Sequence, residues 1–530
     1  MKKINWEETG ELIFYSGLIL LVSFLPESKY MMSVSQFIIA LGWVVNGNVL
    51  GKFKSFFHNK LALIITSIFL LHVIGLLYTE DFQYAFKDLR VKLPLLIFPL
   101  LISTGPRISK NGLERLLFLF CGSVLFATLY CTAVWRGWTY HKIHDIRDIS
   151  VYISHIRFGL MIAFSVLLLG YFIYQYYKTY PPIVTVIISI VILWLLIFLV
   201  ILEAITGLYI LGITVFLLIC YLIWKKKNLY LRIALLVVLI GIPAYLAYSV
   251  YQIYKPIKEI KFNETINLET NSSKGNPYEN DTSKKERENG HLIYIYLNWG
   301  ELHEAWKQRS KFDFDSIGKS GKIIKYTLVR FLSSKGMRKD ADAVNALSDA
   351  EIHTVENGIT NINYQETNSL KARIYEILWE YDDYMNWGDP NGHSVVQRLE
   401  YWKTSLHLIK QHPFIGVGTG DINSAFEKEY ALEHSRLDKE HRLKAHNQYL
   451  SITVTFGIIG LLIFLFALIY PLLVNRNYTD FYYVVFWIFI MLSMFSEDTI
   501  ETQAGVTFFI FFNTVFLFRK KEGGIGGVKF

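Results

Sequence analysis

The chain has 530 residues, of which 52% are hydrophobic and 18% are charged, and its formal net charge is +8. A soluble protein usually has about 25% charged residues. Here the apolar residues stand in blocks of roughly 18 or more, long enough to cross a bilayer as helices. The composition therefore excludes an ordinary soluble protein and predicts an all-α polytopic membrane protein. The basic residues lie beside the apolar blocks, so we expect no nucleic-acid partner.

The apolar blocks predict about twelve transmembrane helices, nine of them before residue 251. The fourth block is short and contains Pro94 and Pro99, so we expect it to be broken or tilted. The expected spans are Leu12–Leu25, Met31–Leu50, Leu61–Leu77, Leu93–Ile102, Leu113–Trp135, Ile156–Tyr174, Ile183–Ile201, Ile205–Trp224, Ile233–Val250, Tyr449–Leu473, Phe481–Met494 and Val506–Phe518.

The basic residues predict the orientation of these spans. If the N-terminus is cytoplasmic, Lys and Arg gather in nearly every cytoplasmic connection and in the C-terminal tail, whereas the opposite short loops also carry acids. This is the pattern of the positive-inside rule. We therefore expect both termini in the cytoplasm and the long hydrophilic block on the other side of the membrane.

The expected domains follow from these spans. They are an N-terminal membrane region (1–250), a large mostly helical loop module between spans nine and ten (251–448), a C-terminal membrane region (449–520) and a cytoplasmic tail (521–530). Within the loop module, Asn263–Gly290 has the composition of a disordered segment. Helical patterns then predict helices over Ile323–Phe331, Leu370–Tyr384 and Val395–Ile409. The turn-forming residues Asn386–Gly392 predict a loop.

The first pattern with chemical content begins at His446, where the hydrophilic block meets an apolar helix. Histidine is the side chain that titrates near neutral pH, so it can act as a general base at a membrane boundary. Without other evidence, an interfacial histidine with no chemistry is the commoner case. Gly457 and Gly460 follow on one helical face, and we expect them to allow close helix packing.

The second pattern joins Arg398 to a glycine-rich turn. Arg398 begins a predicted amphipathic helix, and Gly416, Gly418 and Gly420 follow that helix. Repeated glycines let backbone N–H groups approach an anion, as phosphate-binding loops do. The alternative is a simple helix stop.

The third pattern is Arg157, at the outer mouth of the sixth span. A guanidinium at membrane depth is costly, so it is usually paired or functional, although it can also reach to the interface. His141, His144, Asp145 and Asp148 have the composition of a metal site. Their spacing and loop setting are weak evidence, and we expect no metal and no cofactor.

Together these residues resemble the superfamily of O-antigen ligases and polymerases, membrane enzymes that move glycans off a polyprenyl diphosphate carrier. The resemblance rests on Arg398–Gly420, on His446–Gly460 and on Arg157, together with about twelve spans and a large late loop. It implies metal-independent glycosyl transfer on the periplasmic side of the bacterial inner membrane. His446 would be the general base, and Arg157 and Arg398 would hold the diphosphate.

The resemblance leaves the acceptor open. A lipid A–core acceptor would make the protein a ligase, a growing glycan would make it a polymerase, and a Ser or Thr side chain would make it a protein O-oligosaccharyltransferase. Asn447 and Gln448 are candidate sugar contacts, together with the three glycines. The expected partners are the lipid-linked glycan donor, one of these acceptors and membrane lipids. A lipid-linked glycan transporter and a non-catalytic receptor are the alternatives from other classes.

Overall fold

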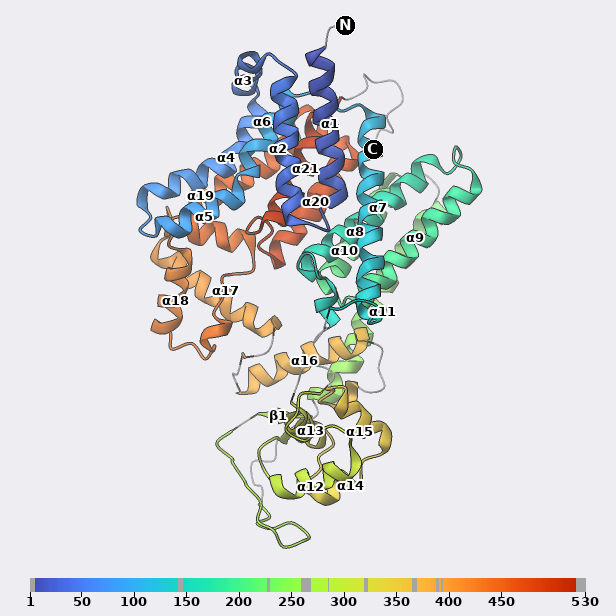
Figure 1. Cartoon of the computed structure of the whole chain (residues 1–530), viewed down its shortest axis with the longest axis vertical. Coiled ribbons are helices and arrows are strands. Elements are labelled where there is room, and N and C mark those ends of the chain that lie inside the picture. Colours follow the sequence, from blue (N-terminus) through green and yellow to red (C-terminus); the bar gives the residue numbers. More distant parts are fainter. Residues whose placement is uncertain are drawn as a thin grey trace. The chain divides into compact units, whose positions relative to one another are not determined.

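The structure is a computed structural model that describes residues 5–141, 146–225, 229–258, 268–284, 286–318, 323–364, 369–387, 390–391 and 394–520. The chain divides into two compact units. Unit 1 comprises Met1–Ala133, Ser150–Tyr221 and Gln397–Phe530, and unit 2 comprises Val134–Ile149 and Leu222–Val396. Figure 1 labels the helices and strands and colours them along the sequence.

Most elements of unit 1 are helices that coincide with the expected apolar blocks. They are α1 (Trp6–Phe24), α2 (Lys29–Val45), α3 (Val49–His58), α4 (Lys60–Ile74), η1 (Gly75–Tyr78), α5 (Phe82–Lys92), α6 (Pro94–Thr104), α7 (Lys110–Trp135), α8 (His155–Tyr176), α9 (Pro182–Ile201), α10 (Ile205–Lys225), α17 (Ser394–Gln411), α18 (Ile422–Leu432), η4 (Lys439–His441), α19 (Gln448–Leu473), η5 (Val474–Thr479), α20 (Phe481–Ser496) and α21 (Gln503–Phe518).

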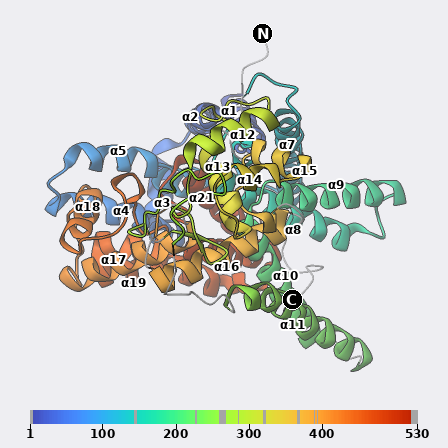
Figure 2. The ribbon, with the colours of Figure 1, turned by 90° about the horizontal axis from the view of Figure 1, so that it is seen from below.

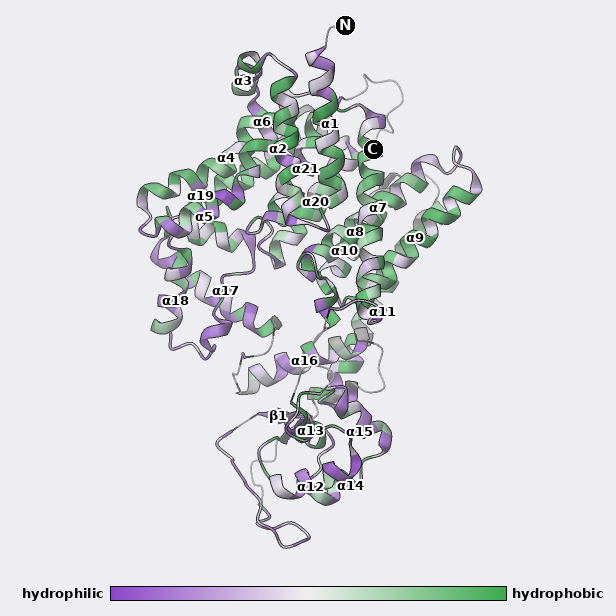
Figure 3. Cartoon of the chain, viewed as in Figure 1, coloured by the Kyte–Doolittle hydropathy of each residue, from purple (hydrophilic) through white to green (hydrophobic). Residues whose placement is uncertain are grey.

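The described residues contain six helices that are long and apolar enough to cross a membrane, or seven if the bent pair α2 and α3 is one span. Three shorter apolar helices, in α10, α20 and α21, add to them. Figure 3 shows the hydrophobic residues concentrated along these helices. The chain is thus a helical, multi-pass membrane protein, while the expected count of twelve spans stays a prediction. The fourth block is short as expected, since α6 has 11 residues and contains Pro99.

The core of unit 1 forms around α21, which is buried along nearly its whole length from Ala504 to Leu517. A helix that is apolar on all sides is suited to such a central position. Phe512 packs against Phe164 of α8 and Phe486 of α20, with ring centroids 5.3 and 5.7 Å apart. These contacts hold together helices from the N-terminal and C-terminal parts of the chain.

Helix α19 is broken at Gly457, where φ is 66° and ψ is −169°. The loop from Pro413 to Gly418 lies against this break and pairs with its backbone. Four hydrogen bonds join them: Val417 N to Val454 O (2.9 Å), Gly418 N to Thr455 O (2.9 Å), Ile458 N to Pro413 O (2.8 Å) and Ile459 N to Phe414 O (3.4 Å). Backbone groups freed inside an apolar helix need such partners.

The glycine pattern of α19 therefore has a different role from the one expected. A side chain at Gly457 would place its Cβ 2.1 Å from the carbonyl carbon of Phe414. Gly457 gives close approach to a loop, not to a second helix. At Gly460 a Cβ would meet Phe456 of the same broken helix, at 2.2 Å. The prediction of helix–helix packing through these two glycines is wrong, because the break brings the loop into that space.

Unit 2 contains the described part of the hydrophilic block up to Val396 and is mostly helical. Its elements are α11 (Leu229–Lys258), β1 (Arg287–Glu288), β2 (His291–Leu292), α12 (Trp299–Arg309), α13 (Ile324–Ser334), α14 (Ala341–Asn345), α15 (Asp349–Glu356), η3 (Ile362–Tyr364) and α16 (Ser369–Trp387), with η2 (Ile146–Ile149). β1 and β2 pair antiparallel. A core around Trp306 and Phe331 holds α12 to α15 together.

Two expectations for this block need correction. Residues 268–284 are ordered: Asn271 bridges Pro277, and Glu279 bridges Leu297. The many polar residues here cap turns and pair with the following strands, so composition alone misjudged them as disordered. Helix α16 also continues to Trp387, beyond the expected start of the loop at Asn386. The division into domains by membrane crossing stays a prediction, because the two units group residues by contact.

Candidate active site

The residues of the site belong to unit 1, and the site begins at the start of α19. Asn447 caps this helix, since its side chain accepts a hydrogen bond from Leu450 N at 3.1 Å. His446 directly precedes the cap with φ at 46°, a left-handed conformation that is uncommon outside glycine. Its ring lies 5.8 Å from the ring of Tyr401 in α17. The cap thus sets the position of His446 at the start of α19, and the ring of Tyr401 lies beside its imidazole.

The turn between α20 and α21 brings the two predicted arginines together. Arg398 Nη2 lies 2.7 Å from Oε1 of Glu497, whose side chain is 3% exposed. Arg157 Nη2 donates to the backbone carbonyl of Asp498 at 3.4 Å, and its Nη1 donates to Ser154 Oγ at 3.0 Å. Guanidinium groups from α8 and α17 thus attach to consecutive residues of one turn.

Arg157 retains an unused donor. Its Nε is buried and has no hydrogen-bond acceptor among the residues that the structure describes. A buried donor without an acceptor is costly. An anionic ligand with several oxygens would supply the missing acceptor, because guanidinium and phosphate groups pair through more than one hydrogen bond.

The environment of His446 favours the neutral imidazole. Burial lowers the pKa of His446 below its ordinary value of 6.5, and the positive charges of Arg398, Arg157 and Lys444 lower it further. The carboxylate of Asp498 acts in the opposite direction. Neutral imidazole is the form that accepts a proton, so His446 is suited to act as a base near neutral pH.

Glu497 is a buried acid, so burial shifts its pKa in the direction opposite to the shift of His446. Burial raises the pKa of Glu497 to about 7, although the neighbouring charges of Arg398 and Arg157 oppose this shift. A carboxyl group with a pKa near neutrality gains and loses its charge easily. The ion pair with Arg398 can therefore weaken when another anion approaches that arginine.

Asn447 and Gln448 attach the start of α19 to the same turn. Asn447 Nδ2 donates to Phe495 O at 2.8 Å. Gln448 is fully buried, and its Oε1 accepts a hydrogen bond from Ile500 N at 2.8 Å. Both side chains position the site in this structure. Their predicted contact with a sugar stays a prediction.

The glycine-rich turn uses its backbone donors within the protein. Gly416 N donates to His412 O at 3.3 Å, and Gly418 N donates to Thr455 O at 2.9 Å. Gly420 N donates to Thr79 Oγ1 at 2.7 Å. Gly416 and Gly418 have φ values of 68° and 96°, which suit glycine. These contacts give the turn a structural role, and its predicted contact with substrate is untested.

Sequence reasoning missed a buried charge cluster beside this site. Lys92 Nζ lies 2.5 Å from Asp88 and 3.1 Å from Glu501, and Lys444 Nζ lies 3.2 Å from the same oxygen of Glu501. The sequence signal was present, because Lys92 directly precedes an apolar block and Glu501 lies between two others. In a linear sequence both residues look like loop charges that mark topology.

The predicted metal-like group is described only in part. His144 and Asp145 lie outside the described residues, whereas His141 is exposed and Asp148 belongs to η2. His141 and Asp148 belong to unit 2. The expectation that this group binds no metal stays a prediction.

The comparison with known families bears on the segment that carries most of this site. Residues 351–465 match the family Wzy_C, described as O-antigen ligase. The match includes Arg398, the glycine-rich turn, His446 and the break at Gly457. No curated protein matches the chain. The resemblance predicted from the sequence is thus confirmed: residues 351–465 of this multi-pass membrane protein match the O-antigen ligase family.

Proposed function

We propose that the protein is a membrane glycosyltransferase of the ligase type. It transfers a glycan from a polyprenyl diphosphate carrier to an acceptor hydroxyl on the periplasmic side of the bacterial inner membrane, with both termini in the cytoplasm. The observation that supports this most directly is the convergence of Arg157 and Arg398 on Glu497 and Asp498, with His446 within their electrostatic reach.

The chemistry of the proposed step matches these three side chains. The acceptor O–H gives its proton to Nδ1 or Nε2 of His446 while its oxygen forms a bond to C1 of the sugar. The bond between C1 and the phosphate oxygen breaks, and polyprenyl diphosphate leaves with that electron pair. The guanidinium groups of Arg157 and Arg398 stabilise the charge that develops on the diphosphate.

Asp498 supports the charge that forms on His446. Its negative charge favours the protonated imidazole, and its side chain is fixed by a hydrogen bond from Ser451 Oγ at 2.7 Å. Burial and the arginines keep the resting imidazole neutral, so it can accept the proton. Asp498 then stabilises the imidazolium that the reaction produces.

Glu497 holds Arg398 in the absence of the donor. When a diphosphate approaches, it must share or replace the ion pair between these residues. The raised pKa of Glu497, about 7, makes this exchange easier because protonation removes the competing charge. Arg398 would then be preformed for the donor without being locked to its protein partner.

The acceptor decides which member of the superfamily this protein is. We propose the ligase-like reaction, with a lipid A–core acceptor, ahead of polymerisation onto a glycan or transfer to a protein Ser or Thr. Asn447, Gln448, Gly416, Gly418 and Gly420 remain proposed contacts of the substrates. Parallel assays with lipid, glycan and peptide acceptors, and one polyprenyl-linked donor, would assign the acceptor.

Substitution of the base tests the mechanism. His446→Ala should lower the transfer rate about 10²–10⁴-fold, the usual contribution of a general base. His434→Ala is a matched control, because His434 also has a left-handed backbone (φ 48°) but is exposed and follows α18. The control should keep its activity. Full transfer by an inserted, folded His446→Ala protein would overturn the proposed mechanism.

Substitution of the diphosphate-binding arginine tests the donor. Arg398→Ala should abolish transfer, whereas Lys410→Ala, an exposed cation on the same helix, should not. Membrane insertion and expression of both variants serve as controls. If lipid-linked glycan crossed vesicle membranes and Arg398→Ala stopped that movement without affecting transfer, the protein would be a transporter instead.

A further inference from the structure

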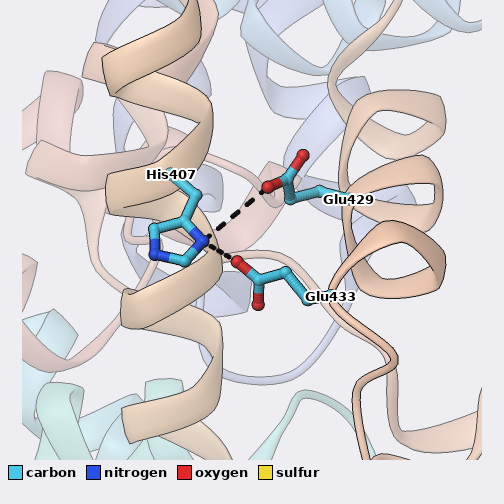
Figure 4. Close-up of side chains that lie close together, drawn as sticks. All are labelled: His407, Glu429 and Glu433. Carbon is cyan, nitrogen blue, oxygen red and sulfur yellow. Dashed lines mark ion pairs between the residues drawn. The ribbon is translucent and has the colours of Figure 1, made fainter.

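A second group of chemically active side chains lies between α17 and α18, in unit 1. It consists of His407 on α17, Glu429 on α18 and Glu433, the residue that caps the end of α18 (Figure 4). One ligand atom from each residue lies within 4.8 Å of the others. The two glutamates are one helical turn apart, so both point from the same face of α18 toward the histidine.

One oxygen of each carboxylate is held by a hydrogen bond and the other faces His407. Gln411 Nε2 donates to Oε2 of Glu429 at 2.9 Å, and Thr404 Oγ1 donates to Oε2 of Glu433 at 3.3 Å. The remaining oxygens both point at His407 Nδ1. Oε1 of Glu429 lies 3.7 Å from it, and Oε1 of Glu433 is in direct contact with it. Such outer hydrogen bonds orient carboxylates that bind metals.

The group also contains a buried oxygen whose described polar contact is with His407. Oε1 of Glu433 is buried and makes no hydrogen bond to the described residues beyond its ion-pair contact with His407 Nδ1. The Glu433 side chain is only 10% exposed and that of Glu429 only 6%. This oxygen faces the centre of the group in Figure 4. A cation placed between this oxygen and His407 Nδ1 would replace their direct contact with two ligand bonds.

The charges of the two carboxylates are balanced only in part by the described cations around them. His407 pairs with both, but it carries a charge only when it is protonated. Two carboxylates are buried side by side, and the lysine paired with them, Lys403, lies 3.9 Å from Glu433 with its side chain 57% exposed. Buried charges are costly unless they are paired or coordinate a metal. A divalent cation would neutralise both carboxylates at once.

We propose that His407, Glu429 and Glu433 bind one divalent transition-metal cation, for which Zn²⁺ is the best match. One imidazole nitrogen and two carboxylate oxygens form a ligand set that Zn²⁺ accepts in tetrahedral sites. Mg²⁺ and Ca²⁺ prefer oxygen ligands throughout and more of them. Bonds of about 2.0–2.2 Å would separate the ligand atoms by roughly 3.4 Å, so side-chain rotations are enough to form the site.

The proposed cation would have a structural role. It joins α17 to the end of α18. Arg398, which contacts Glu497, lies nearer the start of α17 than His407 does. Fixing the rotation of α17 would help to hold that guanidinium in place. The cation would take no part in glycosyl transfer, so the proposal is independent of the proposed reaction.

Metal analysis of the full-length protein in detergent tests this proposal. After chelation and dialysis against low-micromolar Zn²⁺, the wild-type protein should retain about one Zn²⁺ per chain, measured by mass spectrometry of the metal. Zn²⁺ should also raise the thermal midpoint of the chelated protein. Glu433→Gln and His407→Ala should lose most of the bound Zn²⁺ and the thermal shift. Glu433→Gln keeps the side-chain shape, and gel filtration verifies its folding.

A neighbouring group of similar composition supplies the control. Asp438, Glu440 and His441 also bring three potential ligand atoms together, but the two acids are exposed. His441→Ala should therefore bind Zn²⁺ and shift its midpoint as the wild-type protein does. Absence of bound Zn²⁺ from the wild-type protein, or equal binding by Glu433→Gln, would overturn the proposal. Loss of Zn²⁺ in His441→Ala with retention in His407→Ala would move the site to the other group and overturn it as well.

Discussion

The break in α19 gives the sharpest prediction for stability. At Gly457, φ of 66° with ψ of −169° is a conformation that essentially only glycine adopts, and another residue there costs about 1–3 kcal/mol. A Cβ would also lie 2.1 Å from the backbone of Phe414. The loop would have to move, which weakens the hydrogen bonds from Ile458 and Ile459 at about 0.5–1.5 kcal/mol each. Gly457→Ala should thus destabilise unit 1 by about 2–6 kcal/mol.

The thermal midpoint of the purified protein measures this effect. At roughly 2 °C per kcal/mol, typical of large domains, the midpoint should fall by about 4–12 °C. Gly122→Ala in α7 is the matched control, because nothing lies within 4 Å of a Cβ at that position. It should be neutral or slightly stabilising. A Gly457→Ala protein as stable as the Gly122→Ala protein would refute the assignment of this break.

Three further predictions concern the site and the charges beside it. Transfer activity should rise with pH through the lowered pKa of His446, so the acid limb of the pH profile should lie below pH 6.5. Lys444→Met removes a positive charge that lowers this pKa, so it should move the acid limb to higher pH. Lys92→Met should destabilise the protein by about 3–5 kcal/mol, since it leaves a buried carboxylate unpaired, and adding Asp88→Asn should recover part of that loss in thermal unfolding. Asn447→Ala should cost about 0.5–2 kcal/mol of stability through loss of the helix cap, and a circular dichroism melt would detect it. An unmoved acid limb in Lys444→Met would contradict the role of His446 as the base. If Asp88→Asn recovered no stability, the unpaired buried carboxylate would not be the cause of the loss. An unchanged melt for Asn447→Ala would contradict the helix cap.

The apolar helices were predictable because hydrophobic runs specify them directly. Helices α7, α8, α9 and α19 begin and end within a few residues of the expected spans. Length and composition alone do not determine how many helices cross the membrane. Helices α2 and α3 show the reason: they are apolar enough together to count as one span, yet they are bent by 108°. The turn at Gly47 and Asn48, both with positive φ, produces this bend.

The arrangement of the site was predictable only in part. Arg157, Arg398 and His446 were identified because a charged or titratable residue at a membrane boundary is conspicuous in a sequence. Their protein partners, Glu497 and Asp498, were visible only as acids in a short outer loop. Contact between them depends on how α8, α17 and α20 pack, and no local pattern encodes that packing. The pairing of the glycine-rich turn with the break in α19 was hidden for the same reason.

Arg398, the break in α19 and His446 are connected through the region from α17 to α19. In Figures 1 and 2, α17, α18 and α19 lie together with α4 and α5. Arg398 is held by Glu497 near one end of α17, while the loop after its other end pairs with the break at Gly457. The start of α19 carries His446. A displacement of α17 would therefore change the separation between the proposed anion-binding guanidinium and the proposed base. The proposed reaction needs the leaving group and the acceptor hydroxyl to be held in a fixed geometry. Rigid attachment of α17 at both ends would meet this need.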